Sequence, residues 1–154
     1  STAGLSCSIQ RRGNFRMPNK RDETESLVRR YYERFNAHDA AGMLACLCDD
    51  VVHDVNQGER RKGRALFASF MEHMNRCYRE QLRDIVVLSS ADGARAAAEF
   101  VVHGKYLATD EGLPPATGQT YVLPAGPFFE MTTGQITRVT TYYNLKDWMA
   151  QVVG

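Results

Sequence analysis

Two ionisable side chains, His53 and Asp54, stand next to each other in a short apolar stretch that runs from Val51 to Asn56. Both residue types can move a proton, since histidine has an unperturbed pKa of about 6.5 and an apolar pocket raises the pKa of a carboxylate towards neutral pH. The stretch predicts a short strand, in which neighbouring side chains point to opposite faces. The sequence therefore predicts one inward proton-transfer residue, either His53 or Asp54, and a regular register favours His53.

The remaining histidines and cysteines give no pattern of a preformed metal site. The four histidines lack HxH or HxxxH spacing, and the four cysteines lack the paired spacing of zinc sites. The scatter of the cysteines predicts reduced, mostly buried thiols and a cytoplasmic protein. The glycines form no phosphate-binding loop, and no GxSxG motif marks a covalent nucleophile. We therefore expect chemistry that needs neither cofactor nor metal.

The first part of the chain has the periodicity of helices that could hold such a strand in place. Asp22 has the capping-box spacing to a glutamate, and an apolar stripe at helical spacing follows it as far as Phe35. Asp39 predicts the start of a shorter helix that includes Leu47. A third helix is expected after Gly63, because the apolar residues that follow it fall on one face.

The second part of the chain is typical of long strands joined by turns. Asp92-Gly93 is a hairpin signal, and the prolines at 124 and 127 predict a bend, a bulge or an edge position. Asn144 predicts the start of a short terminal helix. The strands are expected over residues 82–90, 94–107, 119–131 and 135–143. This order predicts an α+β fold, in which a curved antiparallel sheet wraps around three helices like a cone.

Charge divides the chain into two parts. Residues 1–21 hold five basic residues and no acid, and we expect a flexible basic extension before a single domain over residues 22–154. The rest of the chain has 14 basic and 18 acidic residues, a net charge of −4, which is a poor match for nucleic-acid phosphates. No uncharged apolar stretch is long enough to span a membrane. We therefore expect neither nucleic acid nor a membrane as a partner.

Several segments together resemble one known superfamily. They are Tyr31-Tyr32, 35–39, 49–54, Gly63 with the helix after it, and 138–148. In this order they resemble the nuclear transport factor 2-like superfamily, and within it the SnoaL-like branch that is related to ketosteroid isomerase. The resemblance extends from about Asp22 to Val153. It implies a cone of helices and sheet around one deep apolar pocket, usually in a homodimer.

The resemblance also implies a chemistry, which this sequence matches in part. In ketosteroid isomerase a carboxylate moves a proton beside a carbonyl, while a tyrosine and a protonated aspartate bind the oxyanion that develops. Tyr31 matches that tyrosine. The general-base position falls on Val55, one residue after Asp54, and the protonated-aspartate position falls near Gly126-Pro127, where no acid is present. A one-residue bulge in the strand would turn Asp54 inward.

We therefore expect a small isomerase or cyclase that acts by acid–base proton transfer on an apolar, carbonyl-containing molecule in a deep pocket. Tyr31 is expected to polarise the substrate, and an inward His53 would need the hydroxyl of Tyr31 or Tyr143 as a hydrogen-bond partner. The expected ligand-binding residues are Asn56, Phe67, Met71, Phe100, Val102, Thr141 and Tyr143. The alternative is a non-catalytic module that binds a small apolar ligand or associates through its sheet. A pocket carboxylate or histidine with a shifted pKa beside a tyrosine hydroxyl would favour the enzyme.

Two expectations concern packing. The inner side chains should converge on one cavity, and they are Leu27, Tyr31, Phe35, Phe67, Met71, Phe100, Val102, Val139, Thr141 and Tyr143. The uncovered face of the sheet should carry Val101, Val122 and Tyr142, which predicts a homodimer through that face.

Overall fold

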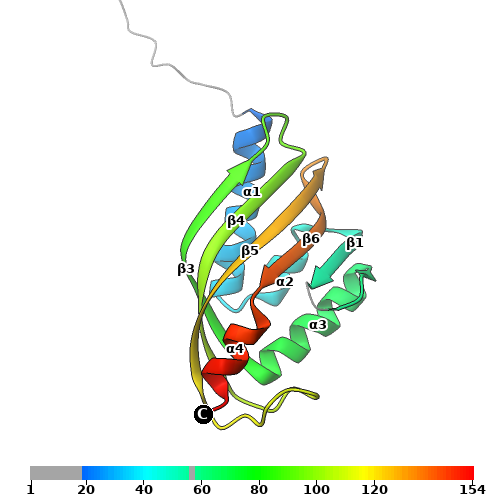
Figure 1. Cartoon of the computed structure of the whole chain (residues 1–154). Coiled ribbons are helices and arrows are strands. Elements are labelled where there is room, and N and C mark those ends of the chain that lie inside the picture. The colour runs from blue at the N-terminus through cyan, green and yellow to red at the C-terminus, as the bar shows by residue number, and fades with distance from the viewer. Residues whose placement is uncertain (1–18, 56–57) are drawn as a thin grey trace, which may run out of the picture.

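The computed structural model describes residues 19–55 and 58–154, which form four helices and six strands (Figure 1). In chain order these are α1 (Lys20–Asn36), α2 (Ala40–Leu44), β1 (Leu47–Val55), β2 (Arg61–Lys62), α3 (Arg64–Cys77), β3 (Tyr78–Ser89), β4 (Arg95–Tyr106), β5 (Thr120–Thr132), β6 (Gln135–Tyr143) and α4 (Leu145–Val152). The expected ligand-binding residue Asn56 lies outside the described residues, as does most of the basic extension.

The six strands form one curved, mixed sheet in the order β2-β1-β6-β5-β4-β3. The four long strands pair antiparallel, as the sequence predicts, whereas β1 runs parallel to β6. Parallel strands need a long connection between them. β1 and β6 can pair in parallel because a helix and three long strands separate them along the chain. The α+β class and the curved sheet are confirmed, and the expectation of a purely antiparallel sheet is wrong at β1.

The helices gather on one side of the sheet. Helix α1 packs against β3 and β4, and α3 lies against β1, β2 and the start of β3. Figure 1 shows α1 along the inner side of β3 and β4, α3 crossing the open end of the sheet, and α4 beside the end of β6. Helices α1 and α3 therefore both pack on the inner face of the sheet.

Helix α1 begins at Lys20, two residues before the predicted start. The side chain of Asn19 caps the helix by accepting a 2.9 Å hydrogen bond from the backbone N–H of Asp22. Asp22 is therefore a first-turn acid, which stabilises the positive end of the helix dipole, and the cap lies three residues earlier. Lys20 and Arg21 belong to the helix and not to an extension.

The tip of the β3–β4 hairpin is fastened to α1. Gly93 has a φ of +71°, as expected of a hairpin glycine, and its carbonyl accepts a 2.6 Å hydrogen bond from the Thr24 hydroxyl. A Cβ at this position would lie 2.5 Å from the backbone oxygen of Lys20. Glycine is therefore required here both for the turn and for the close approach of the helix.

Strand β3 starts four residues earlier than the sequence predicts and follows α3 directly. Residues 78–81 are mostly polar, so they lack the apolar pattern on which the prediction rests. Pairing with β4 holds them in the sheet, with Tyr78 opposite Tyr106 and Glu80 opposite Gly104. Leu47 is likewise a strand residue at the start of β1, and not part of the second helix. The two-residue strand β2 is absent from the prediction.

The core confirms most of the expected inner residues. Leu27, Tyr31, Phe67, Met71, Phe100, Val102 and Val139 are buried, while Phe35, Thr141 and Tyr143 are partly buried. The three described cysteines are free thiols, and Cys46 and Cys77 are buried. None of the described helices has the length and apolar character needed to cross a bilayer.

Candidate functional site

A cavity of about 800 Å³ lies between the inner face of the sheet, α1 and α3. Helix α3 lines it from Leu66 to Asn75, so the cavity follows most of the helix. Eight of the expected site residues border it: Tyr31, His53, Phe67, Met71, Phe100, Val102, Thr141 and Tyr143. Asp54 does not border it.

His53 is the inward residue of the β1 pair. Only 5% of its surface is exposed, and its ring packs at centroid distances of 4.3 Å from Phe67 and 4.7 Å from Phe70. Burial, helped by the nearby charge of Arg61, lowers the pKa of His53 from 6.5 to about 4. The imidazole is therefore neutral at neutral pH. Its Nδ1 has no hydrogen-bond partner among the described residues.

Asp54 points to the other face of the sheet, so it is not placed to act in the cavity. Its carboxylate accepts a 2.8 Å hydrogen bond from Arg60 Nε and a 2.7 Å bond from the hydroxyl of Thr140. The hydrogen bonds from Arg60 and Thr140 lower its pKa, which keeps it ionised. The irregularity in β1 lies between Leu47 and Val52, and the register is regular from there to Val55. No bulge therefore turns Asp54 inward.

Tyr31 borders the cavity from α1 and is 4% exposed. Its ring makes edge-to-face contacts with Tyr32 and Phe129, at centroid distances of 5.0 and 6.1 Å. Burial raises the pKa of Tyr31, so the phenol keeps its proton and remains a hydrogen-bond donor. In the described part of the chain no hydrogen bond joins Tyr31 to His53. The first of the two expected partners is therefore not bonded to His53, whose ring packs on Phe67 and Phe70, and a bond to the other, Tyr143, stays a prediction.

A carboxyl group that the sequence did not single out lies on the cavity wall. Glu80 of β3 accepts a 2.8 Å hydrogen bond from the hydroxyl of Tyr121 on β5. Strand β4 lies between them, and Gly104 is the β4 residue opposite both. A Cβ on Gly104 would lie 2.1 Å from Tyr121 Cζ, so the tyrosine reaches Glu80 only because this residue is glycine.

The environment of Glu80 makes its carboxylate a stronger base than that of a solvent-exposed glutamate. Burial raises the pKa of this carboxyl above its usual range, while the hydrogen bond from Tyr121 opposes the shift. Burial and the charge of Glu80 raise the pKa of Tyr121, which therefore stays a donor. The Tyr121 hydroxyl donates to one carboxyl oxygen, Oε2, and the Glu80 side chain borders the cavity.

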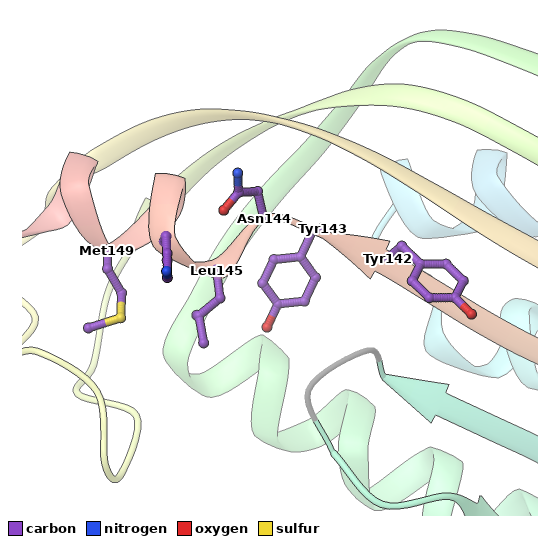
Figure 2. Close-up of a pocket in the computed structure, with 6 residues that line it drawn as sticks. Tyr142, Tyr143, Asn144, Leu145 and Met149 are labelled. Carbon is purple, nitrogen blue, oxygen red and sulfur yellow. The ribbon is translucent and has the colours of Figure 1, made fainter.

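Tyr143 lines both this cavity and a shallow groove on the outside of the protein. The groove is lined by Tyr142, Tyr143, Asn144, Leu145, Lys146 and Met149, and Tyr143 and Leu145 border the cavity too. Figure 2 shows the ring of Tyr143 pointing from the end of β6 towards α3, while Tyr142 points elsewhere. Burial first, and then the charges of Glu80 and Asp110, raise the pKa of Tyr143. The phenol therefore stays protonated and lies within electrostatic reach of Glu80.

The end of the cavity near α4 holds further polar and aromatic groups. Trp148 packs against Tyr121 at a centroid distance of 6.0 Å and against Tyr78 at 6.1 Å. The Tyr78 hydroxyl donates a 2.7 Å hydrogen bond to Asp110, which also lies 2.9 Å from His73 Nε2. The cavity thus has polar groups at both ends of α3, with His53 near the first turn and Glu80 and Asp110 near the last.

The curved mixed sheet with helices on its inner face defines the nuclear transport factor 2-like fold. A protein of that fold from Burkholderia xenovorans LB400, only 14% identical, aligns over 87% of this chain and 98% of its own with a TM-score of 0.67. The sequence profile of the SnoaL-like domain matches residues 28–139, which is more than half of the chain. The chain therefore belongs to the SnoaL-like domain family, and the predicted membership is confirmed.

Two solved structures are much more similar. A candidate polyketide cyclase from Pseudomonas putida KT2440 is 65% identical, covers 84% of this chain and 98% of its own, and has a TM-score of 0.84. Another from Xanthomonas campestris pv. campestris is 60% identical over 87% of this chain and 99% of its own, with a TM-score of 0.85. Among curated proteins, none matches this chain.

Proposed function

We propose that this protein is a cofactor-independent isomerase or cyclase that moves a proton on an apolar carbonyl compound bound in the cavity. Glu80 is the proposed acid–base group. Tyr143 is the proposed donor to the carbonyl oxygen, and Tyr31 and the neutral His53 are proposed to bind the ligand near β1. The observation that carries the proposal is the Glu80–Tyr121 hydrogen bond on the cavity wall.

This pair has the properties that general acid–base catalysis requires. A catalytic carboxyl works best when its pKa is raised towards the operating pH, and burial of Glu80 acts in that direction. Tyr121 fixes one carboxyl oxygen, which restricts the rotation of the carboxyl group on the cavity wall. A carboxyl with a perturbed pKa beside a tyrosine in a cavity is typical of catalytic sites. The arrangement favours an enzyme over a binding module.

The proposed step begins with ionised Glu80. The carboxylate takes a proton from the carbon next to the carbonyl, and the electron pair of that C–H bond passes into an enolate. A hydrogen bond from Tyr143 stabilises the charge on the enolate oxygen. Return of the proton from Glu80 to a different carbon gives an isomer. Attack of the enolate carbon on a second carbonyl of the same molecule closes a ring, and the proton held by Glu80 passes to the alkoxide that this attack creates. Neither outcome needs an oxidant or a reductant.

The names of the similar structures support the ring-closing branch. Two of them, at 65% and 60% identity, are candidate polyketide cyclases. A polyketide carries several carbonyl groups, so one enolate and one acceptor carbonyl can occur in the same molecule. A cavity of about 800 Å³ is in the size range of small-molecule sites.

The test measures proton removal directly, without knowledge of the natural substrate. Cyclohexanone, acetophenone and menthone are incubated with the protein in D₂O, and deuterium uptake beside the carbonyl is measured by mass spectrometry. Glu80→Gln is expected to slow the uptake by at least about 100-fold. Glu99→Gln, on the exposed outer face of β4, is the matched control and is expected to leave it unchanged.

Binding is measured separately by the fluorescence of Trp148, the only tryptophan of the chain, which borders the cavity. Binding retained by Glu80→Gln together with lost exchange supports the proposal. Exchange that is equally fast in Glu80→Gln removes Glu80 from the mechanism. Binding without any exchange in the unmodified protein favours the alternative of a binding module.

A further inference from the structure

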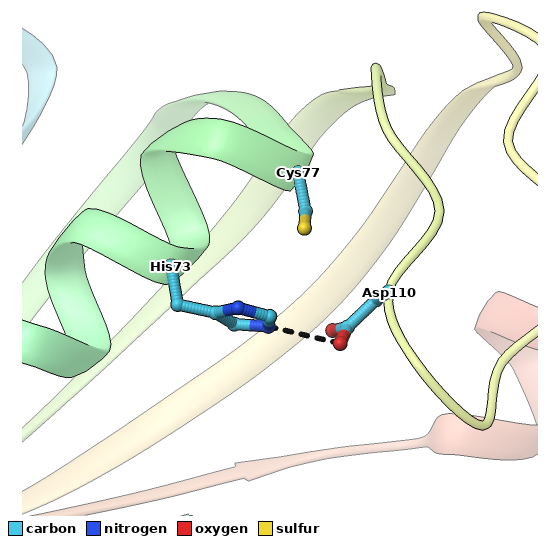
Figure 3. Close-up of side chains that lie close together, drawn as sticks. All are labelled: His73, Cys77 and Asp110. Atoms are coloured by element: carbon cyan, nitrogen blue, oxygen red, sulfur yellow. Dashed lines mark hydrogen bonds and ion pairs between the residues drawn. The ribbon is translucent and has the colours of Figure 1, made fainter.

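Three side chains that can bind a metal ion meet at the end of α3. His73 and Cys77 lie four residues apart in the last turns of α3, so they project from the same side of the helix. Asp110 approaches them from the loop that follows β4. Figure 3 shows Cys77 Sγ, the His73 ring and the Asp110 carboxylate facing one another. Their ligand atoms lie within 4.8 Å of one another.

The loop that carries Asp110 is fastened to the end of the helix. The backbone N–H of Leu107 donates a 2.7 Å hydrogen bond to the carbonyl of Cys77. The hydroxyl of Tyr106 accepts a 2.9 Å bond from the N–H of Asp110 and donates a 2.7 Å bond to the carbonyl of Pro114. These bonds hold the backbone on both sides of the cluster, so the three side chains are already assembled.

The carboxylate of Asp110 is oriented as well. Its Oδ2 accepts a 2.7 Å hydrogen bond from the Tyr78 hydroxyl, and its Oδ1 lies 2.9 Å from His73 Nε2. A carboxylate that binds a metal ion commonly has a supporting hydrogen bond on its other oxygen, as Asp110 has from Tyr78, which fixes its direction. In the metal-free protein the proton on Nε2 occupies the place between His73 and Asp110 that an ion would take.

We propose that His73, Cys77 and Asp110 form a binding site for a divalent transition-metal ion of the Zn²⁺ class. A thiolate, an imidazole and a carboxylate are all donors that Zn²⁺ accepts, and Zn²⁺ sites with three protein ligands keep one position open. His73 and Asp110 border the cavity, so that position faces the ligand space or water. The site is separate from Glu80 and goes beyond the proposed function, which needs no metal.

The protons and charges involved in binding Zn²⁺ at this site can be accounted for in full. The thiol of Cys77 loses its proton to solvent, and the imidazole proton of His73 moves from Nε2 to Nδ1. Three bonds form to the ion, through Sγ, Nε2 and Oδ1. The thiolate and the carboxylate together neutralise its two positive charges. One proton is therefore released for each ion bound.

One neighbouring charge opposes the site. Arg76, which is exposed, lies with its Nη2 3.2 Å from His73 Nδ1 and holds that nitrogen as an acceptor. An ion on Nε2 requires Nδ1 to carry the proton, so the guanidinium must swing into solvent. Its positive charge also repels the ion. Removal of the Arg76 side chain should therefore strengthen metal binding, whereas removal of a ligand should weaken it.

The experiment uses the full chain without an affinity tag, stripped of metal by a chelator and kept reduced. Zn²⁺ binding is measured by competition with a chromogenic chelator, and Co²⁺ serves as the spectroscopic probe. We expect one equivalent of tightly bound ion, and a thiolate-to-cobalt charge-transfer band in the near ultraviolet. Cys77→Ser and Asp110→Asn should each weaken binding by at least about tenfold, and Arg76→Ala should strengthen it.

The control is Cys48→Ser, since Cys48 is a partly exposed free thiol on β1, beside the first residue of α3 and not the last turns that carry His73 and Cys77. Circular dichroism confirms that each variant is folded before titration. The proposal is overturned if the unmodified protein binds no stoichiometric Zn²⁺, if the thiolate band is missing, or if Cys77→Ser binds as well as Cys48→Ser. Unchanged affinity in Arg76→Ala removes His73 from the ligand set. None of these results depends on activity, so they leave the role of Glu80 to its own test.

Discussion

The hydroxyl of Tyr121 donates a 2.8 Å hydrogen bond to Glu80 across the strand that lies between them. The two residues are 41 positions apart in the chain. The bond exists because β3, β4 and β5 place Glu80, Gly104 and Tyr121 in one row, and because the middle residue has no side chain. The ring of Tyr121 fills the space over Gly104. The proposed acid–base group therefore depends on a glycine that makes no polar contact itself.

Gly104→Ala is expected to break this pair. The added methyl group would lie 2.1 Å from Tyr121 Cζ and 2.4 Å from its hydroxyl oxygen, so the ring must move. Overpacking of this kind costs about 1–3 kcal/mol of unfolding free energy, measurable by urea unfolding. Without the bond the pKa of Glu80 should rise further, because the Tyr121 hydroxyl is the group that lowers it.

Gly58→Ala is the matched control, since a Cβ there meets only the Val55 oxygen at 3.8 Å. Gly58→Ala should leave the free energy of unfolding and the rate of deuterium exchange nearly unchanged. Equal stability of Gly104→Ala and Gly58→Ala would contradict the structure at this point.

Glu80 should also leave a signature in the pH dependence of stability. Burial raises its pKa in the folded protein above the value in the unfolded chain. The folded state therefore binds the proton more tightly, and the resulting stability is present at low pH and lost as pH rises through the folded pKa. Glu80→Gln removes this titration. Compared with the unmodified protein, the variant should gain relative stability as pH rises from acid to neutral.

Urea unfolding of both proteins at a series of pH values checks this. A difference in unfolding free energy that stays constant with pH would show that Glu80 titrates alike in the folded and unfolded states. Glu99→Gln should follow the unmodified protein, because its side chain is exposed on the outer face.

Local patterns in the sequence were enough to predict every helix and strand except the two-residue β2, and the direction of His53. The boundaries of β6 are Gln135 and Tyr143 as predicted, and Asn144 caps α4. Strand alternation places His53 inside and Asp54 outside, and both follow from the register of β1 with β6. These features depend on periodicity and caps, which a sequence displays directly.

The proposed site could not be derived in the same way. Glu80 lies in a polar segment without strand periodicity, and only the β3–β4 pairing turns it towards the cavity. Its approach to Tyr121 depends on the register of three strands, which no local pattern specifies. The spacing of His73 and Cys77 is visible in the sequence as HxxxC, but Asp110 joins them only through the loop after β4. Glu80 and Asp110 were not predicted as site residues because their contacts are with segments far away in the chain.

The outer face of the sheet predicts a homodimer. Val122, Phe128 and Tyr142 are about half exposed there, and Phe128 and Tyr142 contact each other edge to face at 5.7 Å. Val86 and Leu88 on β3 extend the same apolar face. Exposed apolar patches of this kind commonly mark association surfaces. Phe128→Asp should therefore shift the protein towards monomer in sedimentation velocity at micromolar concentration.

Leu66→Asp provides the comparison, because Leu66 is 50% exposed on α3, on the other side of the molecule. It should leave the sedimentation coefficient as it is. A monomer in the unmodified protein, or equal effects of the two substitutions, would count against a dimer through the sheet.

The neutral His53 should limit stability in acid. The folded protein lowers its pKa to about 4, whereas the unfolded chain protonates histidine near 6.5. Its contribution to stability is therefore present above about pH 6.5 and is lost as pH falls towards 4. A shift of this size corresponds to about 3 kcal/mol of unfolding free energy. His53→Phe, which keeps a ring between Phe67 and Phe70, removes the titration and should flatten this part of the pH profile.

The measurement is urea unfolding of the unmodified protein and His53→Phe at about pH 7 and about pH 4. The unmodified protein should lose more stability than the variant between these values. Only the unmodified protein has a buried imidazole that resists the proton which the unfolded chain takes up. Parallel losses would mean that His53 titrates like an exposed histidine. The same variant tests ligand binding near β1: if His53 hydrogen-bonds the ligand, His53→Phe weakens the Trp148 fluorescence response, whereas deuterium exchange on bound ketone continues through Glu80.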